Sequence, residues 1–109
     1  MTTVQFYTEG SRISGFQVEG HSGLAQEGMD ILCAAVTSTV RFVECAVNDV
    51  LGLEAAVKVR EEDAVITLKI PGGLSQELEH TCQTILATMM LYMVQLSEEY
   101  PENIIVLEV

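Results

Sequence analysis

The chain has 109 residues, enough for a single domain over residues 1–109 with one hydrophobic core. Apolar residues make up 49% of the sequence, which argues against intrinsic disorder. Five basic and sixteen acidic residues give a formal charge of −11. A chain this acidic repels phosphate backbones, so we expect no direct binding of nucleic acid. A basic protein partner is electrostatically allowed.

The three cysteines, Cys33, Cys45 and Cys82, are odd in number and include no CxxC pair. This pattern argues against a disulfide scaffold and against a zinc site, and we expect neither a metal nor a cofactor. Thiols without a disulfide framework fit a reducing compartment, and no signal peptide is visible, so we expect a cytoplasmic protein. Both long apolar stretches carry polar residues, so we expect no membrane span.

Alternating apolar and polar residues predict two strands near the amino terminus, over residues 3–8 and 13–19, joined by a glycine turn. The segment 20–28 then breaks the pattern with three glycines. Residues 29–51 predict a long helix that ends at Gly52. Because its apolar residues cover more than one stripe, we expect this helix to be covered on two sides.

Two further strands are predicted over residues 55–60 and 64–70, the second with a clean alternation. Ser75 can cap a second long helix, which runs to about residue 99, and a last strand covers residues 104–109. The element order β-β-α-β-β-α-β predicts an α+β fold, with two long helices packed on a mostly antiparallel sheet.

Cys33 and His21 form the candidate catalytic pair. With Asp30 as the helix N-cap, Cys33 lies in the first helical turn, where the positive end of the helix dipole favours the thiolate. His21 lies twelve positions earlier, in the glycine-rich segment, from which its imidazole can fold back to take the thiol proton. Backbone N–H groups at the same helix end can receive an oxyanion.

Each of these residues also has a purely structural interpretation. A cysteine in an apolar helix is commonly a packed small hydrophobe, and a histidine in a loop is commonly a surface residue. From spacing alone, the structural interpretation is the more common one. By the same reasoning Cys45 and Cys82, which fall on apolar helix faces, are expected to be buried and inert.

The segment around the candidate pair contains a specific combination of residues. It reads Gly20-His21 and then Gly28-Met29-Asp30-Ile31-Leu32-Cys33-Ala34-Ala35-Val36. This combination resembles the signature of the ribosomal-processing cysteine proteases, the Prp family. The resemblance continues into two stretches nearer the carboxyl terminus, which begin at Gln83 and Glu98.

The resemblance implies a small homodimeric endoprotease that removes a short N-terminal extension from a large-subunit ribosomal protein. The family's nucleophile falls on Cys33 and its base on His21, with Asp30 and Thr37 at supporting positions. Asp30 either orients His21 or only caps the helix. The family's substrate loop falls on a segment that includes Ser22, Gly23 and Gly28.

Two residues depart from the family pattern: many members have alanine at the position of Ser22 and serine at that of Thr37. Thr37 retains the hydroxyl, and neither change affects the pair. One alternative to the endoprotease is a non-catalytic dimeric module that binds a ribosomal protein or an assembly factor. Another is a thiol-redox protein, but Cys45 lies about 18 Å from Cys33 by helical rise, too far for a disulfide.

Overall fold

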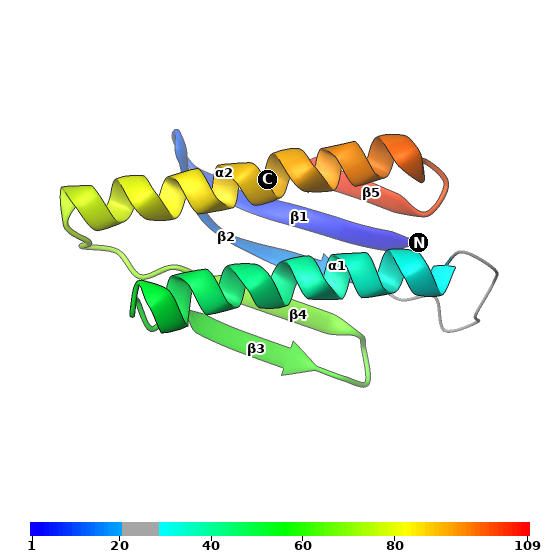
Figure 1. Cartoon of the computed structure of the whole chain (residues 1–109), viewed down its shortest axis with the longest axis horizontal. Coiled ribbons are helices and arrows are strands. Elements are labelled where there is room, and N and C mark those ends of the chain that lie inside the picture. Colours follow the sequence, from blue (N-terminus) through cyan, green and yellow to red (C-terminus); the bar gives the residue numbers. More distant parts are fainter. Residues whose placement is uncertain (21–28) are drawn as a thin grey trace.

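The structure, a computed structural model, describes residues 1–20 and 29–109, except for the side chains of residues 29 and 30. In this part of the chain five strands and two long helices follow one another in the predicted order. They are β1 (Thr2–Glu9), β2 (Arg12–Glu19), α1 (Met29–Glu44), the short π-helix η1 (Cys45–Val50), β3 (Ala56–Arg60), β4 (Val65–Lys69), α2 (Gln76–Glu99) and β5 (Ile104–Glu108). Both long helices lie on the same face of the sheet, and the other face has no helix on it (Figure 1).

The sheet has the strand order β3-β4-β2-β1-β5. Its neighbouring strands pair in an antiparallel sense, except for β1 and β5, which are parallel. The predicted α+β fold with a mostly antiparallel sheet is therefore confirmed. Strands β1 and β2 form the predicted hairpin, with a bulge between Tyr7 and Thr8. Strand β3 lies at one edge of the sheet and β5 at the other.

The hydrophobic core lies between the sheet and the two helices. Helix α1 and the turn that follows it contribute one buried stripe with spacings of three and four residues, formed by Leu32, Val36, Val40, Val43 and Val47. Helix α2 contributes a matching stripe, formed by Cys82, Leu86, Met89, Met93 and Leu96. On the sheet side, the rings of the paired residues Phe6 and Phe16 lie 6.1 Å apart between centroids. Each helix therefore packs on the sheet through a single stripe.

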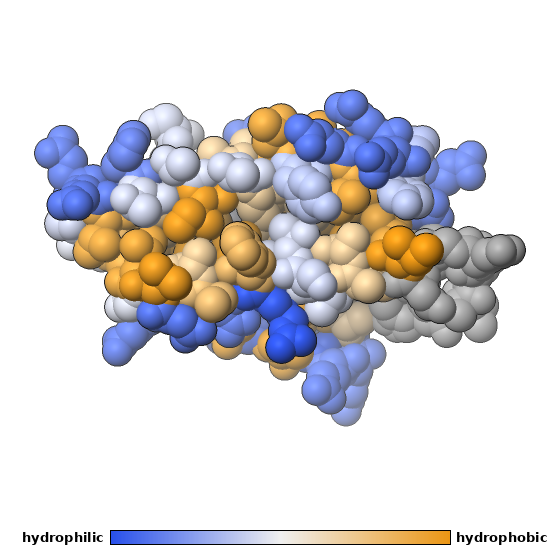
Figure 2. Space-filling view, viewed as in Figure 1, coloured by the Kyte–Doolittle hydropathy of each residue, from blue (hydrophilic) through white to orange (hydrophobic). Residues whose placement is uncertain are grey.

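Helix α1 differs from the sequence expectation in two respects. The predicted helix 29–51 is α-helical only to Glu44 and continues as the π-helix η1, followed by Gly52 with a φ of +68°. Within the single chain the expected cover on two sides is not found, because the sheet covers one side of the helix while Phe42 and Val50 are 77% and 76% exposed. Apolar side chains therefore remain on the outer face of the helix layer (Figure 2).

By length and composition alone, the stretch Ile31–Val50 could cross a membrane, with a mean hydropathy of 1.4. This is weak evidence for a span, because helices that pack in the core of a globular domain pass the same test. The buried stripe of α1 against the sheet is packing of that kind.

Side chains of α2 hold the start of strand β2. The Gln83 amide oxygen accepts a hydrogen bond from the Ile13 backbone N–H at 2.7 Å, and its amide nitrogen donates to the Ile13 carbonyl at 2.8 Å. One turn earlier, the Arg12 guanidinium donates to a Glu79 carboxylate oxygen at 2.8 Å. At the start of the same helix, the Ser75 hydroxyl accepts from the Leu78 N–H, as the predicted N-cap requires.

We predict that Gln83→Ala lowers the free energy of unfolding by about 2 kcal/mol, because the N–H and the carbonyl of Ile13 both lose their partner. The matched control is Thr81→Ala, since the exposed Thr81 hydroxyl donates to the carbonyl of Glu77 in its own helix. We expect the control to change stability by less than about 0.5 kcal/mol. Urea unfolding of both variants measures this, and equal losses would contradict the prediction.

Candidate active site

Cys33 lies half-buried on α1 and lines a pocket of about 220 Å³. The pocket lies at the end of the sheet where α1 begins, between the first turns of the helix and the ends of strands β1 to β4. Its inner wall is apolar and includes Val18, Val36 and Ile66, whereas Thr2 and Glu61 add polar groups. The thiol therefore faces a small, partly apolar hollow at the surface of the protein.

The start of α1 places Cys33 deeper in the helix than the sequence predicts. The helix already includes Met29, so Asp30 lies within it and is not its N-cap. In an α-helix each N–H bonds to the carbonyl four residues earlier, so the N–H of Cys33 already lies within the helical bonding pattern. The N–H groups without helical partners are therefore those of the first turn, before Cys33 in the chain.

Thr37 lines the same pocket as Cys33 and is exposed. The two residues are four positions apart on α1, which places them on the same face of the helix, one turn apart. The structure thus brings together two of the predicted site residues. The predicted residues His21, Ser22, Gly23 and Gly28 lie outside the described residues, as does the side chain of Asp30.

Gly20, the residue directly before His21, also lines the pocket. Its N–H donates to the carbonyl of Ala64 at 3.1 Å, and its φ is +92°. A Cβ atom at this position would overlap the carbonyl oxygen of Met1. Only glycine combines this φ with so close a backbone approach. Gly20, the residue before His21, is therefore fixed in the wall of the Cys33 pocket.

The far wall of the pocket comes from the hairpin between β3 and β4, which sequence reasoning did not connect with Cys33. Arg60, Glu61 and Ala64 line the pocket, and Arg60 forms an ion pair with Asp63 at 3.5 Å. Ala64 has a φ of +52°, which costs about 1–2 kcal/mol for a residue with a Cβ. The Ala64 N–H donates to the carbonyl of Glu61 at 3.2 Å, so this φ belongs to the tight turn that joins β3 to β4.

A thiol that faces a pocket from the first turns of a helix is suited to nucleophilic attack on a carbonyl group. Comparison with known proteins agrees with this chemistry and identifies the chain as a cysteine peptidase. The model of the family described as cysteine protease Prp matches residues 1–105, and the chain belongs to this family. The family membership that the sequence motif indicated is thereby confirmed.

Individual relatives are similar to the chain in sequence or in fold. The chain is 27% identical over 92 residues to the ribosomal processing cysteine protease Prp of Bacillus subtilis (strain 168), an alignment that covers 84% of this chain and 82% of that protein. The crystal structure of Prp from S. aureus in complex with a substrate peptide matches all of both chains, with a TM-score of 0.85 and 19% identity. SMU.848 from Streptococcus mutans matches all of this chain and 94% of its own, with a TM-score of 0.86 and 19% identity.

The other two cysteines differ from each other. Cys82 is buried in the core, as predicted, and burial together with the nearby Glu79 carboxylate raises the pKa of its thiol, with Arg12 acting in the opposite direction. The prediction that Cys45 is buried is wrong, because it lies exposed on the outer face of the helix layer. The apolar residues around it in the sequence, such as Phe42, are themselves exposed and do not form part of the core stripe.

The buried thiol predicts a pH dependence of stability. An unfolded Cys82 ionises near its ordinary pKa of 9.0, whereas in the folded protein the raised pKa keeps the thiol protonated. The folded state therefore binds more protons than the unfolded state above this pH, and stability falls as the pH rises. We expect Cys82→Ala to lose less stability than the wild type as the pH rises. All other titrating groups are present in both proteins, so their contributions cancel in the difference between the two unfolding free energies. Urea unfolding of both proteins from about pH 8 to pH 10 tests this, and parallel curves would contradict it.

Proposed function

We propose that the chain is an endoprotease that removes the N-terminal extension of a large-subunit ribosomal protein, with Cys33 as nucleophile and His21 as base. The observation that supports this most directly is that Cys33 and Gly20, the residue before His21, line the same pocket. The names of the relatives point the same way, since the B. subtilis protein is a ribosomal processing protease and the S. aureus protein was crystallised with a substrate peptide.

In the proposed mechanism the Cys33 thiol transfers its proton to His21, and the resulting thiolate attacks the scissile carbonyl carbon. The C–N bond then breaks, leaving a thioester on Cys33, and His21 gives its proton to the departing amine. His21 next removes a proton from water as the water oxygen attacks the thioester. The new carboxyl terminus leaves, and the sulfur recovers its proton.

The negative oxygen of each tetrahedral intermediate needs hydrogen-bond donors. Because Met29, four residues before Cys33, is already helical, the N–H of Cys33 is within the helical bonding pattern. The N–H groups of the first turn, which lack helical acceptors and lie at the positive end of the helix dipole, are the donors we assign to this role.

The dimensions and charge of the pocket suit a long peptide with basic residues near the cleavage site. At about 220 Å³ the pocket is smaller than the roughly 300–1,000 Å³ of sites that enclose a small molecule, so it fits a single side chain of a longer substrate. The exposed turn Glu61–Asp63 lies at its rim and is acidic throughout. Such a turn attracts the lysine-rich segments of ribosomal proteins.

We further propose that the protein acts in the cytoplasm as a homodimer, the state that the family resemblance implies. Supporting this, an apolar groove of about 490 Å³ runs between α1 and α2 and is lined by Phe42, Ile85, Met89 and Tyr92. Phe42 is 77% exposed there, and apolar side chains gather over both helices on this face (Figure 2). Large apolar patches on soluble proteins commonly mark contacts with other proteins, and a second copy would cover this one.

We predict that Cys33→Ala reduces cleavage of a peptide that spans the extension junction by about 10³-fold or more, since the nucleophile is lost. Cys45→Ala is the matched control, because it also removes a sulfur atom, but from a cysteine outside the pocket. We expect this variant to cleave the peptide at the full rate. Mass spectrometry of the peptide products measures both rates, and circular dichroism checks the fold. Undiminished cleavage by the Cys33 variant would eliminate the proposed nucleophile.

The dimer predicts that Phe42→Glu converts the protein to a monomer, because the charge enters the centre of the apolar groove. Ile105→Glu is the control, since Ile105 is also exposed but lies on β5 and outside the groove. Sedimentation velocity at several protein concentrations measures the oligomeric state. A monomeric wild-type protein, or a dimer that persists in Phe42→Glu, would contradict this interface.

A further inference from the structure

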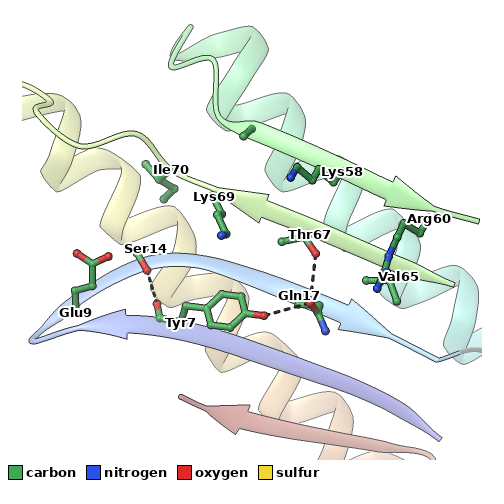
Figure 3. Close-up of a pocket in the computed structure, with 11 residues that line it drawn as sticks. Tyr7, Glu9, Ser14, Gln17, Lys58, Arg60, Val65, Thr67, Lys69 and Ile70 are labelled. Atoms are coloured by element: carbon green, nitrogen blue, oxygen red, sulfur yellow. Dashed lines mark hydrogen bonds between the residues drawn. The ribbon is translucent and has the colours of Figure 1, made fainter. Parts of the chain in front are cut away.

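The face of the sheet that the helices leave uncovered contains a second and larger cavity, an open groove of about 700 Å³ (Figure 3). Its lining comes mostly from strands β1 to β4, and most of the lining residues are of polar types, among them Tyr7, Gln17, Thr67, Lys58 and Lys69. The groove lies on the opposite face of the sheet from the helix layer. Neither the proposed peptidase mechanism nor the dimer uses it.

The groove concentrates positive charge on an otherwise acidic protein. Three of the chain's five basic residues, Lys58, Arg60 and Lys69, line it, and Glu9 is the one acidic residue in the same lining. Arg60 pairs with Asp63. Within residues 1–20 and 29–109, the ion pairs closer than 4.0 Å involve neither Lys58 nor Lys69. The two ammonium groups therefore attract an external anion.

The three cations have a regular spacing. Lys58 and Arg60 are two residues apart on β3 and point to the same face, about 7 Å apart. Lys69 pairs with Ala56 in the register of β3 and β4, which places it diagonally across from Lys58 at about 7–8 Å. Alternate side chains of an extended peptide have the same spacing.

The floor of the groove is preorganised by hydrogen bonds across the strands. The Tyr7 hydroxyl donates to the Gln17 amide oxygen at 3.2 Å, and the Thr67 hydroxyl donates to the same oxygen at 3.4 Å (Figure 3). Gly15 lies between Tyr7 and Lys69 in the strand register and has no side chain to fill this row. A Cβ atom there would overlap the carbonyl oxygen of Leu68. These features keep the groove open beside the lysines.

A peptide suits this surface better than a nucleic acid. The three cations have the spacing of alternate side chains in an extended peptide, and such a peptide can lie over the face of strands β1 to β4. Surfaces that bind single-stranded nucleic acid use several aromatic side chains for base stacking. This groove has one, Tyr7, which is held by its hydrogen bond to Gln17. A charge of −11 also repels a long polyanion more strongly than a short acidic segment.

We propose that this groove is a docking site for an extended acidic segment of a partner protein. Aspartate or glutamate side chains at alternate positions of that segment pair with Lys58, Arg60 and Lys69, while its polar groups contact the hydrogen-bonded side chains of Tyr7, Gln17 and Thr67. The site shares Arg60 with the Cys33 pocket, but Lys58 and Lys69 lie outside that pocket, and the site does not depend on the proposed peptidase reaction.

The test uses a fluorescein-labelled (Glu-Thr)4 peptide, whose acidic side chains occupy alternate positions, and measures fluorescence anisotropy at an ionic strength of about 0.05 M. We expect saturable binding to the full chain, and a loss of affinity of about tenfold or more in the double variant Lys58→Gln/Lys69→Gln. The matched control is Arg41→Glu, which changes the net charge by the same amount at an exposed site on α1. We expect the control to change affinity by less than about twofold.

Further arms of the experiment separate the alternatives. Cys33→Phe, whose ring fills the Cys33 pocket, is expected to bind the peptide as tightly as the wild type, which distinguishes this site from the peptidase pocket. An absence of saturable binding, an equal loss of affinity in Arg41→Glu, or a loss in Cys33→Phe would each overturn the proposal. Tighter binding of a labelled oligouridylate through the same two lysines would also overturn it, in favour of a nucleic-acid site.

Discussion

The packing of one apolar stripe of α1 on the sheet determines where the reactive sulfur points. Leu32 and Val36 belong to this stripe and are 1% and 4% exposed. Cys33 and Thr37 each follow a stripe residue, so they are turned by about 100° around the helix axis, towards the ends of β2 to β4. Rotation of the helix by one residue would bury the thiol in the core. The geometry of the site therefore depends on the rotation of α1 about its axis, which is fixed by the packing of the core residues and not by any single residue of the pocket.

Much of the fold follows from local patterns, whereas the walls of the pocket do not. Alternation and helical spacing predict the elements, and the Ser75 side chain caps α2 as its type suggests. The exposure of Cys45 is not predictable in this way, because periodicity does not show which apolar face of α1 meets the sheet. The hairpin wall around Ala64 depends on the pairing of β2 with β4, which joins residues such as Glu19 and Val65 that are distant in the sequence.

The two faces of the sheet differ in charge, and only one of them is covered by helices. The turn beside the Cys33 pocket is acidic, whereas the uncovered face concentrates Lys58 and Lys69 at one side. Arg60, at the end of β3, lines both the Cys33 pocket and the groove on the uncovered face. The surface charge therefore changes from negative to positive within a few residues of the β3–β4 hairpin. At physiological ionic strength charges are screened over about 8 Å. Separate acidic and basic sites can therefore exist on the same small chain.

The glycine that opens the Gly20-His21 dipeptide has a steric explanation that is independent of the reaction. At this position the end of β2 approaches the carbonyl of Met1, donates a hydrogen bond to Ala64 and requires a φ of +92°. A side chain would force apart strand ends that together form the pocket wall. The residue before His21 is thus held at the same hollow that Cys33 faces. The sequence motif therefore has two separate causes. Glycine is required at position 20 because the strand ends approach closely there, whereas the cysteine on α1 is required for the proposed reaction.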